Sequence, residues 1–189
     1  MAEEFLGDRR RVLEEEFFRK QEQAVLNQLR TAQAQESAHE ALAAATGVRD
    51  RAVLDKLSTL GITSDTLLAL GLVPLVAIAW ADGALDDKER RAIVDNLGAA
   101  GIVADSPAGQ LVQNWLSSPP PASMLEAWSS YTSALAAALS PTERNNLRDS
   151  VLGRARAVAE AAGGFLGFGK RVSQAEAELL QKLARVFGA

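Results

Sequence analysis

The sequence predicts an all-α protein, a bundle of about eight helices that begins with a long N-terminal helix. Apolar residues recur at spacings of three and four almost throughout the 189 residues, which is the period of an α-helix. No window combines strict alternation with the β-branched enrichment of a strand. After Gly47, glycine, proline and capping residues divide the chain into short segments.

Residues 1–47 form the predicted N-terminal arm. From Asp8 to Thr46 there is neither glycine nor proline, and good helix formers dominate, as one helix or two. Gly47 would supply the left-handed cap. Apolar residues fall on two adjacent stripes: Leu6, Leu13, Phe17 and Ala24 on one, and Phe18, Val25 and Leu29 on the other. Such stripes must be covered, by the rest of the chain or by a second copy, and Phe17 and Phe18 are candidate partner-binding residues.

Residues 48–189 form the predicted helical body. Asp50 opens a helix that closes at Gly61, and Thr63 or Ser64 opens the next. Pro74 kinks that helix or begins another at its first turn. The apolar stretch 67–81 has 15 residues, fewer than the roughly 20 that a membrane-spanning helix needs. We therefore interpret it as buried core and expect no membrane insertion.

Later helices begin at recognisable capping signals. Ser106 precedes Pro107, which suits the first position of a helix. A capping box pairs an oxygen-bearing cap with a glutamate three residues later, so that each satisfies a free N–H group of the other. The sequence contains four candidates for it, which are Asp86 with Glu89, Ser123 with Glu126, Ser140 with Glu143, and Ser173 with Glu176.

The bulk composition excludes several function classes. A net charge of −4 and a pI near 5.1 argue against nucleic acid, because phosphate contacts need clustered Lys and Arg. The absence of cysteine excludes disulfides and thiolate metal sites. The N-terminal residues have no apolar core of signal-peptide type, so a cytoplasmic location is expected. No nucleophile or zinc-hydrolase motif is present, so we expect no enzyme.

One stretch invites a metal-site hypothesis. AIAWADGALDDKERR, residues 77–91, aligns with the second half of a calcium-binding EF-hand loop through Asp82, Asp86 and Glu89. The first two ligand positions would fall on Ile78 and Trp80, which offer no side-chain oxygen. These two residues exclude an EF-hand.

The same stretch resembles the TerB-like helical domain of tellurite-resistance proteins. The shared feature is a helix ending in Ala-Asp-Gly, followed by a second helix that opens with an acidic cap and Glu, here in residues 72–102 and loosely to 189. The resemblance implies a TerB-like fold of about eight helices. In that family, acidic residues from two related halves are thought to bind a divalent cation, which implies Asp82, Asp86 and Glu89 as ligands.

The second half of the chain departs from that pattern. Where an Asp-Gly is expected it has GGFLGFGK, residues 163–170, and only Glu176 or Glu178 remains to match Glu89. A bound cation would be Ca²⁺ or Mg²⁺ rather than Zn²⁺, because there is no Cys and a single His. The alternative is purely structural: Gly83 supplies the turn and Asp86 with Glu89 caps a helix. Asp82 is the carboxylate to which the sequence assigns no structural role.

The glycine-rich segment carries the last candidate residues. GFLGFGK, residues 164–170, matches the start of a phosphate loop, but Arg171 replaces the Ser or Thr that binds magnesium, so no nucleotide is expected. Phe165, Leu166 and Phe168 either pack under the bundle or form an exposed patch for a partner.

Two functions follow from the sequence. The first is a non-catalytic cytoplasmic TerB-like protein, a stress-response or signalling scaffold that binds a divalent cation. The second is a metal-independent interaction or oligomerisation module that uses the N-terminal helix and the Gly-Phe segment.

Overall fold

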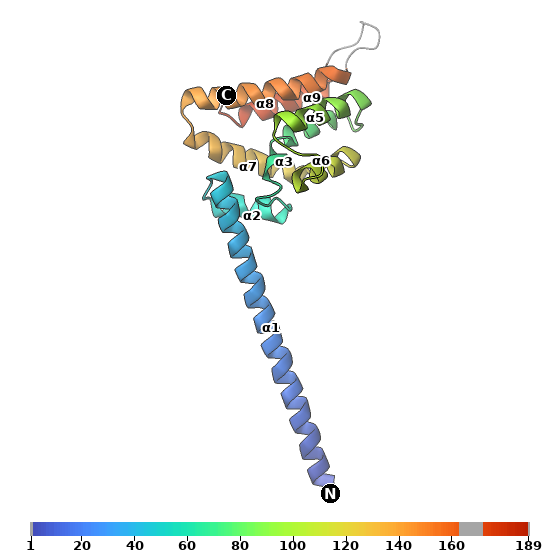
Figure 1. The fold of residues 1–189 in the computed structure, drawn as a ribbon, viewed down its shortest axis with the longest axis vertical. Helices are drawn as coiled ribbons and strands as arrows, with labels where there is room; N and C mark the ends of the chain where they lie inside the picture. Colours follow the sequence, from blue (N-terminus) through green and yellow to red (C-terminus); the bar gives the residue numbers. More distant parts are fainter. Residues whose placement is uncertain (1, 163–171, 189) are drawn as a thin grey trace. The chain divides into compact units, whose positions relative to one another are not determined.

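The computed structural model describes the backbone of residues 2–162 and 172–188, and the side chains of residues 16–161 and 172–188. The described residues form nine helices and no strand. The predicted all-α class is therefore confirmed, and residues 8–46 belong to one continuous helix rather than two. The helices (Figure 1) are α1 Ala2–Thr46, α2 Arg51–Thr59, α3 Leu67–Leu70, α4 Val73–Ala79, α5 Asp87–Ala99, α6 Pro107–Ser117, α7 Ala122–Ala138, α8 Pro141–Ala162 and α9 Gln174–Arg185.

The chain divides into two compact units within α1. The first unit is Met1–Glu40 and the second is Ala41–Ala189. The first unit is a single helix, so it has no second element against which to bury a side chain. The second unit contains the last turns of α1, where Leu42 is buried, and all the other helices.

The second unit is built around α4. This helix packs against α5, α7, α8 and α9, and residues on every side of it are buried, including Leu75, Val76 and Ile78. A helix that is apolar all round is expected in the middle of a core. The prediction that residues 67–81 are buried core is confirmed for most of the stretch, and none of the described helices is long and apolar enough to cross a membrane.

Several predicted helix boundaries are confirmed. The Asp50 side chain caps α2 by accepting from Ala52 N at 2.9 Å. Gly47 and Gly61 adopt the positive φ angles of 71° and 76° that favour glycine. Ser106 caps α6, with Pro107 as its first residue.

Two predicted boundaries are wrong. Ser123 does not cap α7, because the helix begins one residue earlier, directly after Pro121, whose ring already holds φ at −61°. Neither Thr63 nor Ser64 opens the next helix. Instead the Thr66 hydroxyl accepts from Thr63 N at 2.8 Å, and this turn delays the start of α3 to Leu67.

Candidate functional site

The turn between α4 and α5 is fixed by local hydrogen bonds. Gly83, at φ 94°, donates its N–H to the Trp80 carbonyl at 3.0 Å. The Asp82 carboxylate accepts from Ala84 N at 3.1 Å, which is the local bond that Asp commonly makes in turns. The expectation that Asp82 has no structural role is therefore wrong, since its side chain closes the turn.

The other two predicted ligands form the capping box of α5. The Asp86 side chain accepts from Lys88 N, and Glu89 Oε2 accepts from Asp86 N at 3.0 Å. The box is complete, as the spacing predicts. Each of the three candidate metal ligands thus already accepts a local backbone hydrogen bond with its carboxylate group.

A second capping box contains a buried glutamate whose charge acts on Glu89. At the start of α9, Ser173 Oγ accepts from Glu176 N at 3.2 Å, and Glu176 Oε2 accepts from Ser173 N at 2.5 Å. Glu89 and Glu176 are both buried, 4% and 6% exposed, and their charges interact. Of the two matches that the sequence left open for Glu89, the structure brings Glu176 to it, whereas Glu178 is exposed and bonds Gln174.

The surroundings of Glu89 make it an unusually weak acid. Its pKa is raised to about 7, first by burial and then by the negative charges of Glu176, Asp82 and Asp86, against the lowering effect of the hydrogen bond from Asp86 N. A capping box in open solvent behaves in the opposite way. At the start of α8, hydrogen bonds from Ser140 lower the pKa of Glu143. The same motif therefore gives opposite shifts in buried and exposed settings.

These carboxylates do not form a ready-made metal site. Within the described part of the chain, no group of three or more His, Asp and Glu side chains is arranged to hold an ion. Ca²⁺ takes roughly 6–8 oxygens, and Mg²⁺ demands near-ideal octahedral geometry. Oxygens engaged in a turn and two capping boxes are a poor ligand set for either ion. Cation binding at Asp82, Asp86 and Glu89 stays a hypothesis that the sequence resemblance supports better than the geometry does.

The predicted partner-binding residues of the first unit are exposed. Phe17 and Phe18 are 59% and 66% exposed, and their rings meet edge to face with centroids 6.0 Å apart. Val25, Leu26 and Leu29 continue this surface along α1 and are also exposed. We call these five residues the apolar stripe. The other predicted partner-binding residues, Phe165, Leu166 and Phe168, and the phosphate-loop-like match at 164–170, lie outside the described residues.

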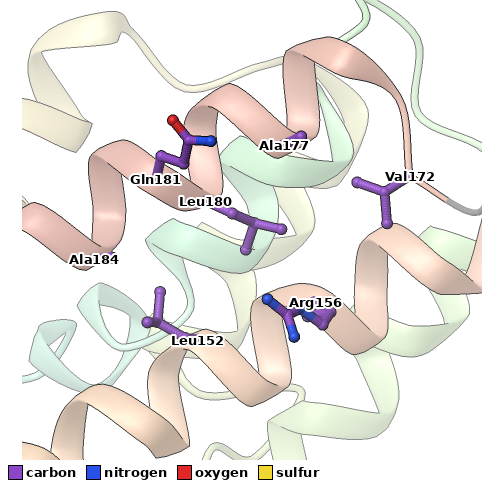
Figure 2. Close-up of a pocket in the computed structure, with 7 residues that line it drawn as sticks. All are labelled: Leu152, Arg156, Val172, Ala177, Leu180, Gln181 and Ala184. Carbon is purple, nitrogen blue, oxygen red and sulfur yellow. The ribbon is translucent and has the colours of Figure 1, made fainter.

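A groove between α8 and α9 has no counterpart in the sequence predictions. It encloses about 450 Å³ and is lined by Leu152, Arg156, Val172, Ala177, Leu180, Gln181 and Ala184. Figure 2 shows Leu152 and Arg156 on α8 across from Leu180 on α9. The spacing of apolar residues in a sequence does not show where two packed helices leave a gap. Only the three-dimensional structure therefore reveals this groove.

Comparison with known proteins identifies no relative. No family model, curated protein or solved structure matches the chain. The TerB-like resemblance therefore rests on residues 72–102 of the sequence alone.

Proposed function

We propose that this chain is a non-catalytic helical interaction module that binds a protein partner through the apolar stripe of its N-terminal helix. The observation that carries the proposal is the exposure of Phe17 and Phe18 beside Val25, Leu26 and Leu29. A single helix cannot bury these side chains, and isolated helices owe little of their stability to propensity alone. Helix-in-groove recognition uses this kind of surface.

Large exposed apolar residues are concentrated in this helix. Those elsewhere in the described chain are Leu68, Val94 and Val103, which belong to different segments of the second unit. Scattered exposed apolar residues are ordinary on protein surfaces, whereas a contiguous set marks a contact surface. The lack of cysteine supports a cytoplasmic setting for such a scaffold.

The proposal is tested by the size of the native assembly. Tagged full-length protein, the double substitution Phe17→Ser with Phe18→Ser, and the control Leu68→Ser with Val103→Ser would be compared by gel filtration of extracts from the cells that make the protein. We expect the wild type and the control to elute well above the 20.1 kDa monomer, and the Phe17 and Phe18 variant to elute as a monomer. A wild-type monomer at all concentrations contradicts the proposal.

Divalent-cation binding is a second candidate function, favoured by one observation. Glu89 is buried among Glu176, Asp82 and Asp86, and these charges raise its pKa; a cation would relieve their repulsion. The test is thermal melting in EDTA and in excess Ca²⁺, Mg²⁺ or Mn²⁺, where a ligand at roughly 100 times its Kd adds about 2.7 kcal/mol. No shift with any ion rejects this candidate and leaves the interaction proposal untouched.

A further inference from the structure

We draw no further inference here: the strongest candidate, the groove between α8 and α9 that Leu152, Arg156 and Leu180 line, carries none, because nothing in the structure shows what fills it.

Discussion

The two units of the chain treat apolar residues in opposite ways. In the second unit, Leu57, Leu75 and Ile78 are completely buried, whereas in the first unit Phe17 and Phe18 are more than half exposed. The difference does not lie in composition, because both units contain large apolar side chains. It lies in the number of elements: a bundle supplies faces that cover one another, and a lone helix supplies none. The proposal that this stripe binds another molecule starts from the absence of a covering face within the first unit.

The sharpest contrast is expected from one pair of leucine truncations. Leu75→Ala removes a fully buried side chain from α4 and should lower the free energy of unfolding by about 2–5 kcal/mol. Leu29→Ala removes a side chain that is 62% exposed. This substitution should change the free energy of unfolding by less than about 0.5 kcal/mol. Urea titration of the two variants measures both values. Equal losses would mean that the first unit is held by the same core as the second.

A pair of glycine substitutions sharpens the account of the second unit. A Cβ at Gly109 in α6 would come within 2.3 Å of the Ala104 carbonyl oxygen, whereas a Cβ at Gly98 in α5 would meet nothing within 4 Å. Gly109→Ala should therefore destabilise by about 1–3 kcal/mol through overpacking. Gly98→Ala should stabilise by roughly 0.5–1 kcal/mol, since Ala suits a helix interior better. Chemical denaturation would show whether the two substitutions change the free energy of unfolding in opposite directions. Changes of the same sign would contradict the close contact between Gly109 and Ala104.

The buried glutamate of α5, Glu89, should make stability depend on pH. Because the folded-state pKa of Glu89 is raised from 4.5 to about 7, its contribution is fully present below the unfolded pKa and is lost as pH rises through the folded value. We expect the free energy of unfolding of the wild type to fall by about 1–3 kcal/mol between pH 5 and 8 as Glu89 loses its proton. The raised pKa sets this pH interval. Glu89→Gln imitates the protonated form and should flatten that part of the profile.

The exposed capping box provides the control for this titration. The pKa of Glu143 is lowered, so its contribution is present above the unfolded pKa and is lost as pH falls. Glu143→Gln should therefore alter the acid side of the profile and leave the neutral range unchanged. Thermal melts across the pH range separate the two groups. A neutral-range slope that survives Glu89→Gln would assign the titration to another residue.

The smallest effect is expected at the helix cap itself. Asp86→Ala removes the side-chain acceptor at the start of α5 while Glu89 keeps its bond to the Asp86 backbone N–H, and it should cost about 1 kcal/mol. Asp87→Ala, on the neighbouring residue, keeps the cap and serves as the control. Melting temperatures of the two variants provide the measurement, and a larger loss for Asp87→Ala would contradict the assignment of the cap.

The sequence predicted what depends on neighbours along the chain and missed what depends on packing. The capping boxes at Asp86, Ser140 and Ser173 form as their spacing indicates, because each is closed within four residues. The box expected at Ser123 fails because Pro121 starts α7 first. The sequence left Glu176 and Glu178 open as matches for Glu89, and only the structure shows that Glu176 interacts with it. Nothing in the sequence indicated that α8 and α9 would leave a groove, since both features depend on how separate helices meet.

The measurement that tests the central claim most directly is hydrogen–deuterium exchange of the full-length protein, compared between the purified chain and its native assembly isolated from cells. If the first unit is stabilised only by a protein partner while the second unit folds by itself, the amides of residues 16–40 should be more protected in the native assembly than in the purified chain. Protection within α4, α5 and α7 should not change, because those helices lie in a self-contained core. Protection of residues 16–40 that is equally strong in the purified chain and in the native assembly would contradict the account.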